Sequence, residues 1–233
     1  MKKSTSVTCV IPAYNECHSI RHTLEAVIGA GDTVDEIIVV DDGSSDGTAD
    51  IVRQFPTVRL FNNEKNGGKS YSIARGITEA RGEYVLMLDA DLLGLEVRNI
   101  RALVEPIVAG KADVSISIRG NTPGWMKAIK VDFMSGERVW LRATLLPHLG
   151  AMGRVRGFGL ELFLNRIIIR NRLRIASVYM ENVNNHMKWK KRGFWRGISH
   201  EANLWREVFS IVSPLEWVMQ NVRMRKLVVP DEA

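Results

Sequence analysis

Two aspartates, Asp89 and Asp91, stand one residue apart at the end of a short apolar run, residues 84–88. The run has β-branched and aromatic members and no proline, which predicts a buried central strand. Residues two apart in an extended chain project to the same side, so we expect the two carboxylates to point together. Their burial costs free energy unless they meet a cation, and paired hard oxygen ligands suit Mg²⁺ or Mn²⁺ holding a phosphate. The alternative is that both aspartates cap the following helix.

Strands and helices alternate through the first half of the chain. Strands are expected over residues 6–12, 36–40, 57–61, 83–88 and 113–118, and helices over 16–28, 47–54, 69–80 and 96–109. This alternation favours an α/β fold with an open, mostly parallel sheet and helices on both faces. Polar loops follow Ile11, Val40 and Leu88, each at a strand end. Because ligands bind at the carboxyl ends of parallel strands, we expect these loops to meet at one crevice.

The alternation fails after residue 118. A loop is expected over 119–126, and helices are expected over 131–146, 200–212 and 214–226. The segment 157–162 is expected to lead into another helix that ends near 171, and a strand is expected over 174–180. The helix over 131–146 is expected to begin near Ser135, and Pro214 divides the last two helices. The C-terminal part is therefore predicted to be mainly helical.

Charge is distributed unevenly along the chain. Residues 1–118 carry 12 Lys and Arg against 17 Asp and Glu, whereas residues 119–233 carry 20 against 9. The net charge of the first half is −5 and that of the second half is +11, which indicates two different tasks. A basic half can meet phosphate groups on a nucleotide, a phospholipid surface or nucleic acid. The alternating basic and aromatic pattern of a nucleic-acid module is missing, so no nucleic-acid partner is expected.

The composition is that of a soluble globular protein, with 45% apolar and 25% charged residues. Cys9 and Cys17 do not form a disulfide framework, and they favour a reducing cytoplasm. No apolar stretch approaches the roughly 18 to 20 residues that cross a bilayer. We therefore expect a soluble or peripheral protein, either free in the cytoplasm or at the inner face of the membrane.

Four loop motifs carry a resemblance to a known family. They are Ile11-Pro12-Ala13-Tyr14-Asn15-Glu16, Val39-Val40-Asp41-Asp42-Gly43-Ser44, Asn66-x-Gly68-Lys69 and Asp89-Ala90-Asp91. In this order and spacing they resemble the family-2 inverting glycosyltransferases of the GT-A fold, nearest the branch of dolichyl- or polyprenyl-phosphate sugar transferases. The resemblance is strong over residues 6–118. Beyond them it rests on Ser135-Gly136-Glu137-Arg138 and Gly157-x-Gly159-x-Glu161.

The resemblance implies a metal-dependent transfer of a hexose from a nucleotide-diphosphate sugar, with inversion. The residues that it assigns to the nucleotide are Pro12, Ala13, Asn15 and Glu16, with Asp41 or Asp42 at the base or ribose. Asp89 and Asp91 match the family's Asp-x-Asp motif and are expected to hold Mg²⁺ or Mn²⁺ on the diphosphate, with Asp91 acting in catalysis. Lys69 is expected to donate to the same phosphates; the alternative is a solvated lysine at a helix start.

The acceptor side rests on three further residues. Glu161 is the expected general base for an alcohol acceptor, although a phosphate acceptor needs no base and a glutamate is also favoured at a helix start. Arg138 is expected to pair with an acceptor phosphate, unless it is an exposed helix charge. His186 is expected to be a third metal ligand, unless it is structural or exposed.

The basic segment 188–226 holds four of the six tryptophans. Basic residues with interfacial aromatics fit a peripheral membrane contact, whereas the alternative is packing onto the core or onto a second subunit in a homodimer. The predicted division of the chain is a nucleotide-sugar-binding half over 1–118, an acceptor-side half of the same domain over 119–199, and a helical appendage over 200–233.

Two other functions compete with sugar transfer to a polyprenyl phosphate or a cell-envelope glycan or lipid. The first is a sugar nucleotidyltransferase, whose first loop is rich in glycine and basic residues, whereas the loop here is Pro12-Ala13-Tyr14-Asn15-Glu16. The second is a non-catalytic scaffold that binds a nucleotide sugar. The intact Asp89 and Asp91 argue against a scaffold.

Overall fold

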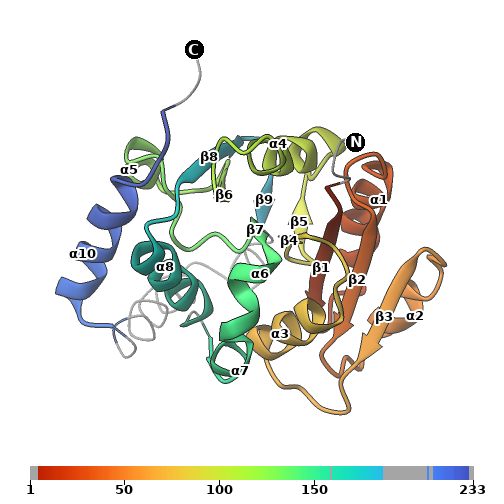
Figure 1. The fold of residues 1–233 in the computed structure, drawn as a ribbon. Coiled ribbons are helices and arrows are strands. Elements are labelled where there is room, and N and C mark those ends of the chain that lie inside the picture. The colour runs from red at the N-terminus through yellow and green to blue at the C-terminus, as the bar shows by residue number, and fades with distance from the viewer. Residues whose placement is uncertain (1–4, 158, 186–208, 210–211, 231–233) are drawn as a thin grey trace, which may run out of the picture.

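A computed structural model describes residues 5–157, 159–185, 209 and 212–230 of the chain. Its centre is a seven-stranded sheet in the order β3-β2-β1-β4-β7-β6-β8. The strands are β1 (Val7–Ala13), β2 (Glu36–Asp41), β3 (Val58–Asn62), β4 (Tyr84–Met87), β6 (Val114–Arg119), β7 (Arg138–Leu141) and β8 (Ile175–Met180). Every pairing is parallel except those of β7, which is antiparallel to both neighbours. The predicted α/β fold with an open, mostly parallel sheet is confirmed (Figure 1).

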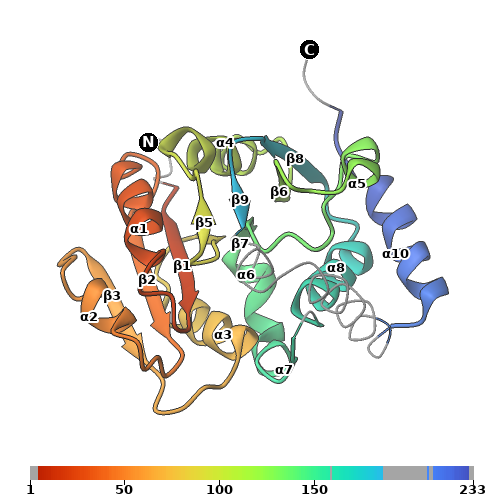
Figure 2. The same ribbon diagram turned by 180° about the vertical axis from the view of Figure 1, so that it is seen from behind.

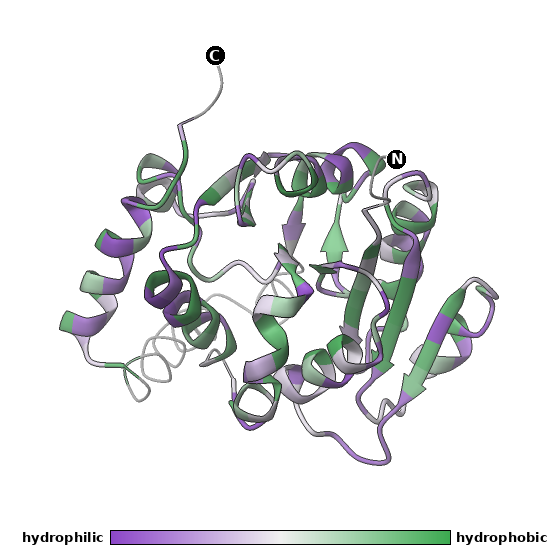
Figure 3. Ribbon diagram, viewed as in Figure 1, coloured by the Kyte–Doolittle hydropathy of each residue, from purple (hydrophilic) through white to green (hydrophobic). Residues whose placement is uncertain are grey.

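Helices cover both faces of this sheet, as predicted. The helices that follow the first strands are α1 (Ile20–Gly29), α2 (Thr48–Val52), α3 (Lys69–Glu79) and α4 (Val97–Val108). Side chains alternate along β1, so that Cys9 and Ile11 belong to one apolar cluster with α1 and α4, whereas Val10 belongs to another with α3. The interior strands are apolar almost throughout, as Figure 3 shows for β1 and β2, because both of their faces are covered.

The predicted helix over 131–146 is wrong. Residues 138–141 form β7 between β4 and β6, and only the short helix α6 (Arg142–Leu145) follows. Val139 and Trp140 are fully buried on opposite faces of the sheet, one in each apolar cluster. A β-branched and an aromatic residue suit a pleated, two-sided environment. Long-range pairing with β4 and β6 therefore outweighed the local helical preference.

The second half of the chain completes the domain around α8 (Gly159–Asn171) and α10 (Pro214–Arg225), which pack together. Its other elements are α5 (Gly124–Ala128), a 3-10 turn (Leu146–His148), α7 (Leu149–Met152), and a small antiparallel pair of β5 (Leu92–Leu93) with β9 (Asn184–Asn185). Figure 1 and Figure 2 place α10 at the edge of the molecule opposite β3.

The C-terminal part is fastened to the core. Met224 of α10 is fully buried in the same apolar cluster as Ile168 of α8, and Val228 forms a parallel bridge with Ile175. The expected mainly helical C-terminal part is confirmed for α10, while the expected helix over 200–212 falls almost wholly outside the described residues. Within the described ranges, no helix is both long enough and apolar enough to cross a bilayer.

Candidate active site

The four motif loops meet at one pocket, with a volume of about 340 Å³, at the carboxyl ends of β1, β2 and β4. The predicted residues that line it are Pro12, Ala13, Glu16, Asp42, Lys69, Asp89 and Asp91. These residues come from loops separated by up to about eighty positions, and the parallel sheet brings them to one edge. The expected crevice therefore exists at the expected place.

The first and second loops are tied together by hydrogen bonds. The backbone N–H of Asn15 donates to the Ser44 hydroxyl at 2.9 Å, and the Asn15 side-chain oxygen accepts from the backbone N–H of Ser45 at 2.9 Å. The Glu16 backbone N–H donates to the Thr48 hydroxyl at 2.8 Å. Asn15 has a φ of 55°, a left-handed conformation that asparagine tolerates better than most residues. These contacts explain why α1 begins at residue 20 and not at 16.

Asp42 holds the third loop against the pocket. Its carboxylate accepts from the backbone N–H groups of Gly67 at 2.9 Å and Gly68 at 2.8 Å, and from the Asn63 side chain at 2.7 Å. Asp41 is equally buried, and its Oδ1 finds no hydrogen-bond partner within the described part of the chain. Asp42 therefore anchors a loop, and contact of either aspartate with a base or ribose stays a prediction.

An ammonium group joins two of the predicted site carboxylates. The Nζ atom of Lys69 lies 2.7 Å from Oδ1 of Asp89 and 3.1 Å from Oε1 of Glu161. Burial opposes the charged form of Lys69, but the negative charges of Asp89 and Glu161 outweigh it and raise the pKa of the lysine above its usual value. Lys69 is therefore a charged member of the site, which favours the functional interpretation over a solvated helix start.

Gly136 allows this cluster to close. A Cβ atom at position 136 would lie 2.7 Å from Nζ of Lys69 and 3.0 Å from either carboxylate oxygen of Asp89. Both distances are shorter than ordinary contacts with a Cβ atom. The absence of a side chain at residue 136 therefore leaves the room that the ion pair occupies.

Glu161 lies in the first turn of α8 and is 5% exposed. It is 92 residues from Lys69 in sequence, and the fold places the two side chains in contact. The structure thus brings this predicted acceptor-side carboxylate to the same cluster as Asp89. Its role as a general base stays a prediction.

The carboxylates at the pocket fit a divalent cation. Asp89 already holds a positive charge, the Lys69 ammonium, and Asp89 and Asp91 supply hard oxygen ligands at the pocket wall. No group of three His, Cys, Asp or Glu side chains suited to a metal occurs among the residues that the structure describes. Two carboxylates nevertheless suffice for Mg²⁺, which commonly takes its other ligands from water and substrate phosphates.

His186, the predicted third ligand, lies outside the described residues. The chain just before it is placed: β9 ends at Asn185, which pairs with Leu92, the residue after Asp91. The C-terminal half therefore returns beside the Asp89–Asp91 loop. The assignment of His186 as a ligand stays a prediction.

Arg138 is not where an acceptor phosphate would meet it. Its side chain is fully buried on β7 and donates to the carbonyl oxygens of Ser135 at 2.8 Å and Phe133 at 3.0 Å, and to the Asn165 side chain at 2.8 Å. Burial lowers the pKa of Arg138 to about 10. The alternative, an exposed charge on a helix, is wrong as well, because Arg138 lies on the strand β7, which turns its side chain into the interior.

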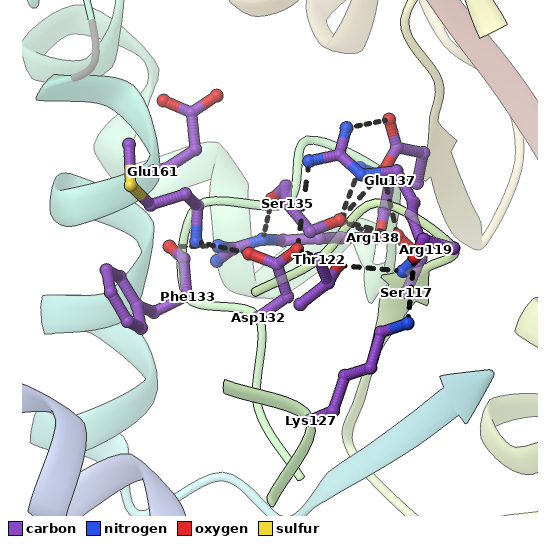
Figure 4. Close-up of polar contacts among 12 residues, drawn as sticks. Ser117, Arg119, Thr122, Lys127, Asp132, Phe133, Ser135, Glu137, Arg138 and Glu161 are labelled. Carbon is purple, nitrogen blue, oxygen red and sulfur yellow. Dashed lines mark hydrogen bonds and ion pairs between the residues drawn. The ribbon is translucent and has the colours of Figure 1, made fainter. Parts of the chain in front are cut away.

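A buried polar network that the sequence did not predict joins the end of β6 to the segment before β7 (Figure 4). Glu137, fully buried, accepts from the hydroxyls of Ser117 at 2.7 Å and Ser135 at 2.8 Å, and pairs with Arg119 at 3.3 Å. Arg119 also lies 3.7 Å from Asp132. Burial opposes the charged form of Arg119, but the surrounding carboxylates raise its pKa.

The sequence contained a signal that could have identified Arg119. It ends the apolar strand β6 just as Asp41 ends β2, and a charged residue at a strand end was the signal used for the aspartates. The partners Glu137 and Asp132 carried no such signal, because their region was predicted to be helical. The position of the network depends on β7 lying beside β6.

Comparison with known proteins places this site in context. The family model described as "Glycosyl transferase family 2" matches residues 8–148. A dolichyl-phosphate beta-glucosyltransferase (ALG5C) of Trichomonas vaginalis is 42% identical over 96 residues, which cover 36% of this chain and 28% of that protein. An undecaprenyl-phosphate 4-deoxy-4-formamido-L-arabinose transferase of Aeromonas hydrophila is 34% identical over 131 residues, covering 52% of this chain and 39% of that protein. The chain thus matches well under half the length of either relative.

Solved structures share the fold. Glucosyl-3-phosphoglycerate synthase from Mycobacterium tuberculosis, in complex with Mn²⁺ and uridine-diphosphate-glucose, superposes with a TM-score of 0.66 at 20% identity, covering 90% of this chain and 80% of that chain. TarS of S. aureus superposes with a TM-score of 0.59 at 19% identity, covering 77% of this chain and 56% of that chain. At these identities the likeness concerns the arrangement of helices and strands.

Proposed function

Because the chain belongs to glycosyl transferase family 2, we propose that it transfers a hexose from a nucleotide-diphosphate sugar to an acceptor, with inversion at the sugar carbon. The observation that carries this proposal is the pocket that joins Asp89 and Asp91 to the loops after β1 and β2. A nucleotide sugar needs both parts, a cleft for the nucleoside and a cation-binding edge for the diphosphate. A sugar nucleotidyltransferase finds no comparable support in the first loop.

The donor that we propose to test first is a uridine-diphosphate hexose. The Mycobacterium tuberculosis neighbour binds uridine-diphosphate-glucose with Mn²⁺, and the Trichomonas relative is named as a glucosyltransferase. In this chain Pro12, Ala13 and Glu16 line the part of the pocket that we assign to the nucleoside, and Asn15 fixes their loop through Ser44.

At the other end of the pocket, the diphosphate faces Asp89, Asp91 and Lys69. Mg²⁺ or Mn²⁺ held by Asp89 and Asp91 supplies the positive charge that stabilises the departing diphosphate. Lys69 contacts both Asp89 and Glu161, so it orients the two carboxylates and keeps a hydrogen-bond donor at the pocket wall. This arrangement is set before the donor binds, which lowers the cost of orienting groups during the reaction.

The acceptor determines what Glu161 does. With an alcohol acceptor, the buried Glu161 carboxylate takes the hydroxyl proton as the oxygen attacks the sugar carbon. With a phosphate acceptor the nucleophile is already ionised, and Glu161 positions Lys69 only. We favour a polyprenyl phosphate, because the Trichomonas and Aeromonas relatives are named for dolichyl-phosphate and undecaprenyl-phosphate; a cell-envelope glycan or lipid is the second choice.

The test is a thermal-shift and transfer assay on the purified chain. Uridine-, guanosine- and thymidine-diphosphate sugars are added with Mn²⁺ or with a chelator, and a ligand that binds the folded state alone raises the melting temperature. Transfer of labelled hexose to polyprenyl phosphate is then measured. The Asp91→Asn variant is expected to lose at least about a hundredfold in transfer rate, while Asp50→Asn, an exposed carboxylate on α2, keeps its rate. Melting temperatures that no nucleotide sugar changes with Mn²⁺ present contradict the proposal.

A further inference from the structure

Helix α10 presents an apolar stripe to the outside of the molecule. Leu215 is 70% exposed, Val218 49%, Met219 42% and Val222 52%. Their spacing is that of one face of an α-helix, at positions i, i+3, i+4 and i+7. We call these four residues the α10 stripe. A stripe of this kind ordinarily faces a core, so its exposure needs an explanation.

The opposite face of α10 is already fixed to the protein, by polar and by apolar side chains. The buried Gln220 accepts from Asn165 of α8 at 3.3 Å and donates to the Leu162 carbonyl at 3.4 Å. Met224 is fully buried on the same face. The helix therefore packs Trp217, Met224 and two amide side chains against the protein, and it leaves four aliphatic side chains exposed. Rotation of α10 to bury the stripe would break these hydrogen bonds.

Positive charge borders the α10 stripe. With 100° per residue, Arg225 lies to one side of the stripe, Arg223 to the other, and Lys226 at its C-terminal end; all three are exposed. The only carboxylate within α10, Glu216, is paired with Arg166 of α8 at 2.7 Å. The exposed face of α10 is thus apolar along its middle and cationic at its borders.

Aromatic side chains lie next to the same helix. Trp125 of α5 is 45% exposed and Phe209 is 41% exposed. Their rings lie 5.7 Å and 6.3 Å, centroid to centroid, from the ring of Trp217 in α10. Partly exposed aromatic rings beside an apolar and cationic helix face are the side chains that the interfacial region of a bilayer accommodates.

We propose that α10 docks on a bilayer surface that contains anionic phospholipids. The α10 stripe enters the boundary between headgroups and acyl chains, and Arg223, Arg225 and Lys226 contact lipid phosphates, with their aliphatic stems lying along the boundary. Docking uses no residue of the pocket, so it does not depend on the transferase activity.

A second copy of the chain explains this surface less well. Four aliphatic side chains cover much less than the roughly 800 Å² per partner that a stable dimer buries. In a two-fold pairing of α10, the cations of each copy would also meet a helix whose one carboxylate, Glu216, is already paired with Arg166. A bilayer matches both features, because lipid phosphates can pair with the three cations and acyl chains can pack against the α10 stripe.

The test is flotation of the full chain with vesicles of phosphatidylcholine alone or with an equal part of phosphatidylglycerol. We expect binding to the anionic vesicles only. The variant Leu215→Ser/Val222→Ser should bind at least about tenfold more weakly, because it removes apolar area that would enter the boundary. The variant Arg223→Gln/Arg225→Gln should lose about fivefold per charge at low salt. All four positions are exposed, so the variants are expected to fold, as circular dichroism and melting temperature will check.

Two matched controls and a second measurement make the outcome decisive. Leu146→Ser changes an exposed leucine away from α10 and Arg98→Gln an exposed arginine; neither should alter vesicle binding. Wild-type protein that does not float with anionic vesicles, or stripe variants that float equally well, overturn the proposal. Light scattering that finds a dimer in the wild type and a monomer in the Leu215→Ser/Val222→Ser variant would assign the stripe to a second copy. The shift in melting temperature with nucleotide sugar should be unchanged in all variants, which separates this test from that of the transferase activity.

Discussion

Replacement of Lys69 by methionine is expected to destabilise the protein in a way that a divalent cation reverses. In the wild type one ammonium lies 2.7 Å from Asp89 and 3.1 Å from Glu161. Methionine keeps most of the side-chain volume and removes the charge, so two carboxylates are left without their shared counter-charge. The site then gains from any cation that enters it.

The magnitude follows from the burial of the three groups. Removal of one partner from a fully buried ion pair costs about 3–5 kcal/mol. The Lys69 side chain is 33% exposed and that of Asp89 17%, so solvent reduces the cost, and we expect about 2 kcal/mol. In a chain of this size that corresponds to a fall in melting temperature of about 4–8 °C.

The assay is urea unfolding and thermal melting of wild type and Lys69→Met, each with a chelator and with Mn²⁺. Mn²⁺ should raise the melting temperature of the variant more than that of the wild type, because it replaces the lost positive charge beside Asp89. Lys65→Met, an exposed lysine in the loop before α3, is the matched control and should change neither quantity. Equal stability of Lys69→Met and wild type in chelator, or an equal response to Mn²⁺, would refute the reasoning.

The pH dependence of this interaction has a defined sign. The pKa of Lys69 is raised in the folded state. A group with a raised pKa contributes stability that is fully present below its unfolded value, about 10.4, and is lost as the pH rises through the folded value. The difference in stability between wild type and Lys69→Met is therefore expected to persist at neutral pH and to shrink in strongly alkaline solution.

Three further predictions follow from the described contacts. Gly136→Ala places a Cβ 2.7 Å from Nζ of Lys69, so this variant should bind nucleotide sugar and Mn²⁺ more weakly in titrations. Its melting temperature should fall little, because the end of the lysine side chain is flexible; a fall in melting temperature as large as that of Lys69→Met would contradict this. Glu137→Gln removes the charge that pairs with the buried Arg119 at 3.3 Å and should lower the unfolding free energy, measured in urea, by about 3 kcal/mol. An unchanged unfolding free energy would show that this ion pair does not stabilise the protein. Desolvation opposes the ionised form of Asp46, but hydrogen bonds from Thr48 and Cys17 outweigh it and lower the pKa of Asp46 to about 2. The stability that ionised Asp46 contributes is therefore present above its unfolded pKa and is lost as the pH falls towards 2. Asp46→Asn should make the melting temperature depend less on pH in acid, and an unchanged pH dependence would contradict this prediction.

The donor half of the fold could be predicted because its signals are local. Each expected strand before residue 119 is a short run with a polar break, and all five occur within one or two residues of their predicted bounds, whereas the two-residue β5 was not expected. The carboxyl-end loops follow from parallel topology. The place of Asp89 and Asp91 at the pocket therefore follows from sequence, and that of Lys69 was predicted from the Asn66-x-Gly68-Lys69 motif. The start of α1 was missed by four residues, because the contacts of Asn15 and Glu16 with the second loop are long-range.

The acceptor half was harder because its elements have no local signature. Residues 138–141 carry a helix-compatible pattern, and they form a strand because β4 and β6 offer two unpaired edges. That one difference turns Arg138 inward and brings Glu137 to Arg119. No periodicity in a single sequence reports which edge a strand will join.

The sequence by itself determined the strand ends, the order of the loops and the types of side chain at the pocket, because these depend on neighbours a few positions apart. Only the tertiary structure decided that Lys69 lies between Asp89 and Glu161, with Gly136 leaving the room for them. It also decided which face α10 buries. These outcomes depend on contacts between residues up to 92 positions apart, whose energies arise only once the sheet has formed.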